Sequence, residues 1–134
     1  MPSRRRRPGV ARRWGIVAPL LMASTRSAVE GHGEGAAVVY VPHTTAGVTI
    51  NENVDPSVRA DLEMALERLV PSDLPFTHLE GNSDAHTKAS LMGSSATIPL
   101  AGGRLQLGTW QGIYLAEFDG PRTRRVLVSV LAAP

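Results

Sequence analysis

Residues 108–118 read GTWQGIYLAEF, and the rest of the chain is interpreted around them. From residue 113 onward the side chains alternate with a period of two, which is typical of a β-strand. One face carries Ile113, Leu115 and Glu117, and the other carries Tyr114, Ala116 and Phe118. A lone buried carboxylate is energetically costly, so Glu117 lies either at the solvated end of the strand or beside a partner that holds it. The usual exposure of acidic residues favours the solvated end.

The length of 134 residues corresponds to one domain, and the hydrophobic fraction of 43% indicates a globular protein. The chain has no cysteine, which excludes disulfides, thiol catalysis and thiolate-bound metals. Histidines and carboxylates are therefore the side chains left to bind a metal. The sequence has no Walker motif and no dinucleotide fingerprint, so we expect no nucleotide cofactor.

The net charge of +2 is unevenly distributed along the chain. Residues 1–26 contain seven arginines and no acid, whereas residues 27–134 contain seven basic and twelve acidic residues. We interpret residues 1–30 as a basic N-terminal leader that is poorly ordered or atypical. Residues 31–134 are interpreted as the folded domain. Nothing in residues 27–134 looks like a nucleic-acid footprint, which would need Lys and Arg clustered on one face of the fold, so we expect no nucleic-acid partner.

The basic leader also bears on where the protein is located. Its arginines are followed by a short apolar run and by Ala23-Ser24, as in a signal peptide, but Pro19 interrupts the run. The run is too short to span a bilayer, so we expect no membrane partner. We expect a cytoplasmic protein, with export as the minor alternative.

The hydrophobic pattern predicts strands and two helices. Strands are predicted over residues 36–41, 44–50, 96–100, 104–110, 112–118 and 124–131, and helices over residues 56–70 and 83–92. Asp55 is a good N-cap and Pro56 a good first residue for the first helix, and Gly93 ends the second. Gly102-Gly103 predicts a hairpin turn. The fold class is therefore α+β, with a mainly antiparallel sheet of five or six strands and two helices in a single domain.

Three histidines are candidate metal ligands. His43 follows a predicted strand, His78 lies in the loop between the predicted helices, and His86 lies near the start of the second helix. Together with a carboxylate such as Glu117 they would match a zinc-type site. No two of them are spaced as ligands on one helix, and three unrelated histidines are the more common arrangement.

Two polar segments are candidate binding loops. Residues 51–55 can bind a hard cation or a hydroxylated substrate, although a turn followed by a helix cap explains the same residues. His86 and Lys88 lie near a predicted helix start, and together with residues 93–95 they can receive a phosphate or a carboxylate through main-chain N–H groups. Gly-Ser-Ser is a common loop composition, so this signal is weak by itself.

Four motifs resemble those of a known family. They are Pro42-His43-Thr44-Thr45-Ala46; Asn51-Glu52-Asn53 followed by Asp55-Pro56; Ala85-His86 followed by Lys88; and the set Ser95, Ile98, Leu100, Gly103, Gly108-Thr109-Trp110-Gln111 and Ile113. In this order they resemble the YjbQ family, also described as the secondary thiamine-phosphate synthase family. The resemblance covers about residues 36–131, and four ordered motifs make it specific.

The resemblance implies a compact α+β fold assembled as a homotrimer, with a site near the subunit boundaries that contains histidines. It also implies a weak thiamine-phosphate synthase activity, in which thiazole phosphate displaces pyrophosphate from hydroxymethylpyrimidine diphosphate. The motif positions suggest catalytic roles for His43, Glu52, His86, Lys88 and Gln111. They suggest substrate binding by Thr44, Asn51, Asn53, Ser94, Thr109 and Trp110, and binding of a divalent zinc or magnesium ion by His43, His78, His86 and Glu117.

Two other functions fit the same residues. One is a non-catalytic homotrimer that binds a small phosphorylated or anionic metabolite, and the other is a metal-dependent hydrolase with a histidine-bound water. The chain departs from the family at its start, because members usually open with a pair of β segments and residues 1–30 do not read that way. Either an unfamiliar sequence forms the N-terminal strand, or the strand is missing and leaves an exposed sheet edge.

Overall fold

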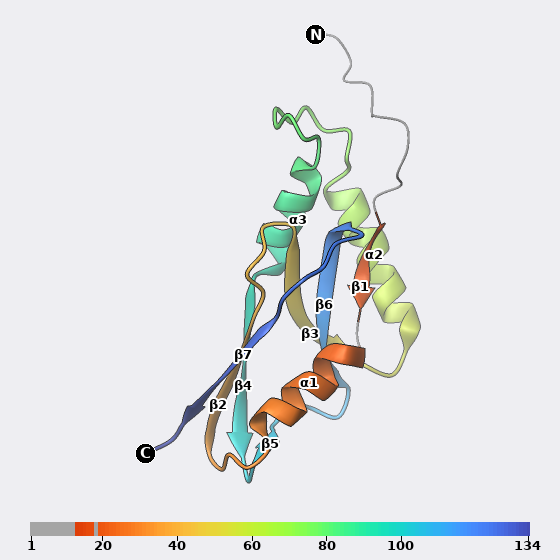
Figure 1. Cartoon of the computed structure of the whole chain (residues 1–134). Coiled ribbons are helices and arrows are strands. Elements are labelled where there is room, and N and C mark those ends of the chain that lie inside the picture. Colours follow the sequence, from red (N-terminus) through yellow and green to blue (C-terminus); the bar gives the residue numbers. More distant parts are fainter. Residues whose placement is uncertain (1–12, 18) are drawn as a thin grey trace.

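The strand predicted from residues 108–118 is the centre of one of two antiparallel sheets. In the computed structural model, which describes residues 13–17 and 19–134, β6 (Gln111–Gly120) lies between β1 (Arg13–Val17) and β3 (Ala46–Glu52). The second sheet has the order β5-β4-β2-β7, with β5 (Arg104–Leu105), β4 (Ser95–Ala101), β2 (Gly35–Tyr40) and β7 (Leu127–Ala132). The helices are α1 (Pro19–Val29), α2 (Pro56–Leu69) and α3 (Ser83–Met92) (Figure 1). The α+β, mainly antiparallel prediction is confirmed. The described residues form seven strands in two sheets and three helices, where one sheet of five or six strands and two helices were predicted.

Both faces of β6 are buried, as its alternating sequence requires. Ile113 is fully buried in a core that also contains Val39 and Ile98 of the second sheet and Met22 of α1. Tyr114, Ala116 and Phe118 face the other way, into a second core. Half-buried leucines of α2 and buried alanines of α3 complete that second core. The three-stranded sheet is thus the middle layer, and it fixes where the ends of β3 and β6 lie.

The described part of the N-terminal segment belongs to this packed fold, which favours the atypical over the poorly ordered alternative for residues 13–17 and 19–30. β1 pairs with β6, and Ile16 is buried beside Phe118. α1 buries Leu21, Met22 and Val29. The sequence did not predict the packing of β1 and α1, because a short edge strand and one helix bury only a few apolar side chains among exposed ones. Of the predicted leader, residues 1–12 and 18 lie outside the described residues.

The sequence left open whether the N-terminal strand is formed by an unfamiliar sequence or is missing, which would leave an exposed sheet edge. β1 occupies the edge position beside β6, so an unfamiliar sequence forms the N-terminal strand. The free side of β1 is blocked, because the backbone N–H of Ile16 donates to Oε1 of Glu63 on α2 at 2.9 Å. A charged side chain in this place prevents the edge from pairing with another strand.

The local signals predicted most of the remaining boundaries correctly. Asp55 caps α2 by accepting from the Ser57 N–H at 2.9 Å, and Gly93 ends α3 with a φ of 94°. Gly102 and Gly103 form the predicted hairpin turn with φ values of 58° and 71°. Residues 106–110 are the exception, since the strand expected there ends at β5 and a turn follows. None of the helices in the described residues is long and apolar enough to cross a membrane.

Candidate functional site

The predicted site residues fall into three spatial groups in the structure. The first group lies at the C-terminal end of β3. Glu52 is opposite Gln111 in the β3–β6 ladder, so Asn51 and Glu52 belong to a strand and not to the predicted turn. The Asn53 N–H donates to the carbonyl of Trp110 at 2.8 Å. The Tyr114 hydroxyl donates to the carbonyl of Glu52. Two motifs that are distant in sequence are therefore joined at one end of the sheet.

Several side chains of this first group accept hydrogen bonds from nearby backbone N–H groups. Asn51 accepts from the N–H of Glu52 at 2.7 Å, and the Glu52 carboxylate accepts from the N–H of Val54 at 3.1 Å. The Gln111 side chain accepts from the N–H of Gly108 at 2.8 Å and so closes the turn before β6. The predicted substrate-binding residues Thr109 and Trp110 are exposed, and Trp110 is 60% exposed.

The second group lies at the opposite end of β3. Nε2 of His43 accepts from the backbone N–H of Arg125 at 2.8 Å, so this nitrogen carries no proton in the bound geometry. Thr44 is exposed, and the carbonyl of Ser94 accepts from the N–H of Val41 at 2.7 Å. His43 thus connects the segment before β3 to the segment before β7.

Glu117 belongs to this second group and is not at a solvated strand end. Its carboxylate accepts from Nε and Nη2 of Arg124 at 2.8 and 2.6 Å, in a fork with two parallel bonds. The two side chains are only 15% and 8% exposed. Arg124 also donates to the hydroxyl of Thr45 at 2.8 Å. Arg124 binds both carboxylate oxygens of Glu117, so the Glu117–Arg124 ion pair serves as a structural contact. This use of both oxygens argues against Glu117 as a metal ligand.

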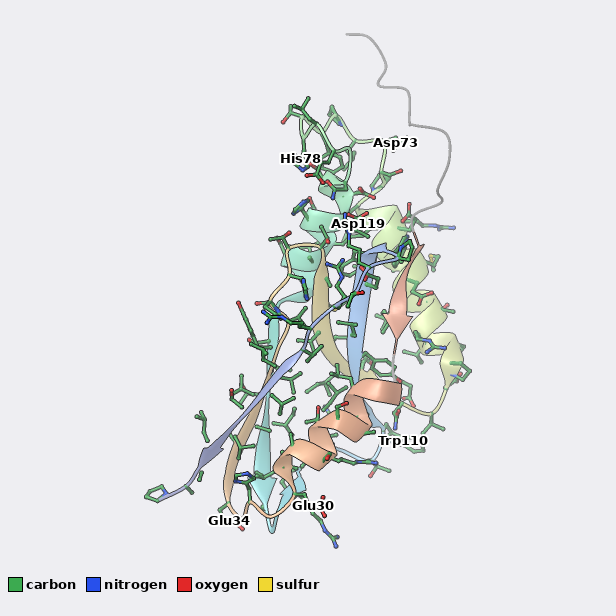
Figure 2. All side chains as sticks on the ribbon, in the orientation of Figure 1. Glu30, Glu34, Asp73, His78, Trp110 and Asp119 are labelled. Carbon is green, nitrogen blue, oxygen red and sulfur yellow. The ribbon has the colours of Figure 1, made fainter. Side chains whose placement is uncertain are left out.

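The third group surrounds α3. The rings of His78 and His86 meet edge to face, with centroids 5.4 Å apart. Lys88 is 1% exposed, and its Nζ donates to Glu67 at 2.7 Å, lies 3.9 Å from Asp84 and sits 4.5 Å from the centre of the Trp14 ring. The ammonium of Lys88 is thus enclosed by two carboxylates and an aromatic face, and the catalytic role of Lys88 stays a prediction. Figure 2 shows His78 in the loop that precedes α3.

A single chain does not unite the groups at the two ends of β3. Seven residues separate them, which at the usual rise of a strand is roughly 20 Å. Within residues 13–17 and 19–134 there is also no set of three His or carboxylate side chains placed to hold a metal ion. One chain therefore does not bring His43, His78, His86 and Glu117 together, and their role as metal ligands stays a prediction.

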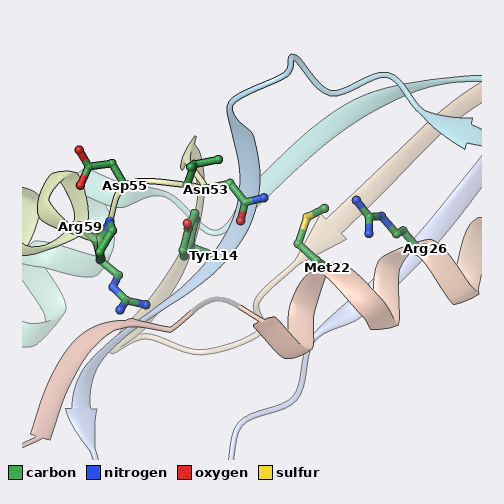
Figure 3. A pocket seen from close by; sticks show the side chains of 8 residues that line it. Met22, Arg26, Asn53, Asp55, Arg59 and Tyr114 are labelled. Atoms are coloured by element: carbon green, nitrogen blue, oxygen red, sulfur yellow. The ribbon is translucent and has the colours of Figure 1, made fainter.

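A pocket of about 380 Å³ opens beside the first group. It lies between α1 and the start of α2, and Tyr114 of β6 contributes to its lining (Figure 3). Met22 and Arg26 approach from α1, while Asp55 and Arg59 approach from the other side. The complete lining is Met22, Arg26, Asn53, Val54, Asp55, Pro56, Arg59 and Tyr114.

Of this lining, sequence reasoning selected Asn53 as a binding residue and missed the two arginines. Arg26 was counted with the leader, and no motif in the sequence analysis includes Arg59. In the structure Glu63 accepts from β1, so Arg59 is available to the pocket. Two arginines on different helices carry no shared sequence signal that would have linked them.

The pocket combines opposite charges. Hydrogen bonds from the Ser57 hydroxyl and the Ser57 N–H hold the pKa of Asp55 below its ordinary value, so Asp55 is charged at neutral pH. The same bonds use the N–H that α2 would otherwise offer to an anion. Arg26 and Arg59 are the cationic side chains among the residues that line this pocket.

Comparisons with known proteins agree with the motifs. The family model described as UPF0047 protein YjbQ-like matches residues 20–133, which include most of α1. The chain belongs to the YjbQ/UPF0047 family. The YugU protein of Bacillus subtilis, a UPF0047 protein, is 49% identical over 102 residues, which are 75% of this chain and 77% of YugU. A UPF0047 protein of Methanocaldococcus jannaschii is 60% identical over 98 residues, which are 73% and 71% of the two chains.

The fold agrees with solved structures of the YjbQ/UPF0047 family. A family member from Clostridium acetobutylicum superposes with a TM-score of 0.85 at 48% identity, covering 91% of this chain and 95% of the other. A YbjQ-like protein from Sulfolobus solfataricus also gives a TM-score of 0.85, at 29% identity, with coverage of 92% and 91%. The names of these four relatives state a family and no reaction.

Proposed function

We propose that this protein binds a small phosphorylated metabolite in the pocket between α1 and α2. The observation that carries the proposal is the pair of guanidinium groups, Arg26 and Arg59, which line one pocket from two different helices. Neither arginine makes an ion pair with another side chain in the described part of the chain. Arginine is the side chain best suited to phosphate, because its fork of donors matches two phosphate oxygens.

The volume and the other lining residues fit a ligand of this kind. A pocket of about 380 Å³ lies within the usual range for small-molecule sites. Met22 and Tyr114 provide apolar surface for a ring, and Asn53 provides an amide that can orient it. Asp55 adds one negative charge beside the two positive ones, which favours a ligand that has both a phosphate and a cationic part.

We further propose that the reaction is thiamine-phosphate synthase-like transfer. The ring nitrogen of thiazole phosphate forms a bond to the methylene carbon of hydroxymethylpyrimidine diphosphate, and the bond from that carbon to oxygen breaks. The electron pair of the broken bond leaves with pyrophosphate. Arg26 and Arg59 then stabilise the charge that develops on the leaving group, which is the role first assigned to Lys88. Asp55 faces the positive charge that the thiazole ring acquires.

The working unit is proposed to be a homotrimer, as the family resemblance implies. In one chain the group around Asn53 and Gln111 is separated from the group around His43 by the length of β3. A neighbouring copy can bring the second group of one chain to the pocket of another. The metal-dependent hydrolase has less support, because the described part of one chain lacks a three-ligand group.

Calorimetric titration with inorganic pyrophosphate tests the pocket. We expect Arg26→Gln and Arg59→Gln each to weaken binding about tenfold or more, the equivalent of losing one charged hydrogen bond. Arg68→Gln is the matched control. Arg68 is an exposed arginine in the last turn of α2, the helix that also carries Arg59, and it does not line the pocket. Unchanged affinity in both pocket variants would refute the assignment of the pocket.

A second assay separates the enzyme from the binding protein. Pyrophosphate release is followed with hydroxymethylpyrimidine diphosphate alone and together with thiazole phosphate. We expect release only when both substrates are present, and a loss of release in Arg59→Gln. Tight pyrophosphate binding without any release would favour the non-catalytic binding protein. Metal-dependent release from the first substrate alone would favour the hydrolase.

A further inference from the structure

A second pocket of about 380 Å³ adjoins the first and lies between β1 and α2. Pro56 and Arg59, near the start of α2, line both pockets. Figure 1 shows α2 running beside β1. The complete lining of the second pocket is Gly15, Ile16, Pro56, Arg59, Ala60 and Glu63. An anion that Arg59 holds in the first pocket therefore lies next to the second.

The second pocket is a slot with little side-chain bulk on its two walls. Gly15 has no side chain and that of Ile16 is 3% exposed, so β1 lines the slot mainly with its backbone. A Cβ on residue 15 would lie 3.1 Å from Oε1 of Glu63, so a larger residue would crowd the slot. On the other wall, Ala60 adds one methyl group a helical turn after Pro56. A flat ring fits between walls of this kind, with the two α2 residues as its apolar surface.

Glu63 provides the slot with a hydrogen-bond acceptor. Its Oε1 accepts from the N–H of Ile16 at 2.9 Å, and no other described residue pairs with its Oε2. The N–H and C=O of one strand residue point to the same side, so the carbonyl of Ile16 also faces α2. A carboxylate oxygen beside a carbonyl binds a hydrogen-bond donor, such as an amino group on an aromatic ring.

We infer that this slot is a second subsite, which binds an aromatic ring that carries an amino group and is joined by a short link to a diphosphate. Arg59 holds the diphosphate, and the amino group donates to Glu63. These two residues are four apart on α2, so their side chains start about 5–6 Å from each other on one face of the helix. A second phosphate does not fit the slot, because the negative charge of Glu63 repels it.

The second subsite, which rests on the proposed function, gives each ring of the transfer reaction its own place. Met22 and Tyr114 in the first pocket contact the thiazole ring, and the slot holds the aminopyrimidine ring of hydroxymethylpyrimidine diphosphate. Because Arg59 lines both pockets, the diphosphate lies between the two rings. The methylene carbon that the thiazole nitrogen attacks is then held beside the first pocket, which favours reaction by proximity.

Calorimetric titration of the full chain with three probes tests this subsite. Pyrophosphate reports binding by the guanidinium groups, benzyl diphosphate adds a ring without an amino group, and hydroxymethylpyrimidine diphosphate adds the amino group. In Glu63→Gln the amide oxygen accepts from the Ile16 N–H and the amide NH₂ meets the amino group, donor against donor. We therefore expect hydroxymethylpyrimidine diphosphate to bind about tenfold more weakly, with the other two probes unaffected. Asp61→Asn is the matched control, because Asp61 is an exposed acid of α2 that lines neither pocket.

Ala60→Leu fills the slot and leaves every charge in place. We expect both ring-bearing probes to bind about tenfold more weakly and pyrophosphate to bind as before. Ala60 is exposed and leucine is a good helix former, so this variant should fold. Ala65→Leu is the matched control, because Ala65 is an exposed alanine of α2 that lines neither pocket.

The outcomes separate the second subsite from the proposed function. A wild type that does not bind pyrophosphate would overturn both. If pyrophosphate binds, but Ala60→Leu and Glu63→Gln bind hydroxymethylpyrimidine diphosphate as the wild type does, the second subsite is overturned and the first pocket stands. A loss in Ala60→Leu alone would also overturn it, since the ring would then be held without its amino group being recognised. An equal loss for all three probes in Glu63→Gln would overturn it as well, because Glu63 would then act only on the structure of the first pocket.

Discussion

The ion pair between Glu117 and Arg124 provides the sharpest test of how this fold is held together. The pair connects β6 to the segment before β7, and Arg124 also bonds to Thr45 at the start of β3. The two side chains are 15% and 8% exposed. Replacing Glu117 by Leu leaves the guanidinium of Arg124 buried without a counter-charge, and replacing Arg124 by Leu does the same to the carboxylate.

The expected magnitude follows from this burial. Removing one partner of a buried ion pair costs about 3–5 kcal/mol, because the remaining charge stays desolvated. That is a large part of the roughly 5–15 kcal/mol that stabilises a domain. With an unfolding entropy of about 2.1 cal/mol/K per residue, a loss of about 4 kcal/mol lowers Tm by roughly 14 °C in a chain of 134 residues. The double variant, with Leu at both positions, leaves no unpaired charge. It is expected to lose only about 1–3 kcal/mol, because the hydrogen bonds from Arg124 to Thr45 are also lost.

Urea unfolding at one fixed protein concentration measures the three free energies of unfolding. We expect the two single losses to exceed the loss in the double variant, which gives a coupling energy of several kcal/mol. Glu80→Leu is the control, because Glu80 lies 4.0 Å from His78 and the two side chains are 68% and 42% exposed, so this variant should lose about 1 kcal/mol or less. Single losses below about 1 kcal/mol, or losses that simply add, would refute the assignment of a buried, coupled pair.

The remaining predictions concern two backbone positions and one carboxylate. Gly47→Ala should destabilise the protein by about 1–3 kcal/mol, since its Cβ would lie 2.6 Å from the carbonyl of Gly93 and press β3 away from α3. Gly33→Ala, whose added Cβ meets nothing within 4 Å, should change stability by no more than about 0.5 kcal/mol in the same urea unfolding assay. Ser57→Ala should raise the pKa of Asp55 toward its ordinary value, as followed by carboxyl NMR. The lowered pKa stabilises the wild type above the unfolded pKa, and this contribution disappears as the pH falls through the folded pKa. An unshifted Asp55 titration in Ser57→Ala would contradict the capping role.

Much of the fold could be predicted because its signals are local. The alternation in residues 113–118 predicted a strand, and the structure shows that both of its faces are buried. Asp55 and Gly93 marked helix ends through caps that need only their neighbours in sequence. The N-terminal strand was missed because β1 buries little of its own surface and depends on its pairing with β6. Its five residues, RWGIV, also do not alternate between apolar and polar side chains.

The candidate site was predicted less well, because its chemistry depends on long-range contacts. The sequence selected Asn53 and Trp110, and the structure brings their backbones together. It could not indicate that Lys88 is enclosed, since the side chains around it come from three different elements. The sequence also could not show whether Glu117 is solvated or is bound by an arginine seven residues later in the chain.

The sequence alone determined the fold class, the family and most element boundaries, since periodicity, caps and turn residues act over a few positions. Only the tertiary structure decided which charged side chains form ion pairs within the fold and which line a pocket. Arg26 and Arg59 line one pocket only because α1 and α2 pack near the same end of β6. Electrostatic interactions of this kind depend on separation in space and on burial, and neither can be read from the order of residues.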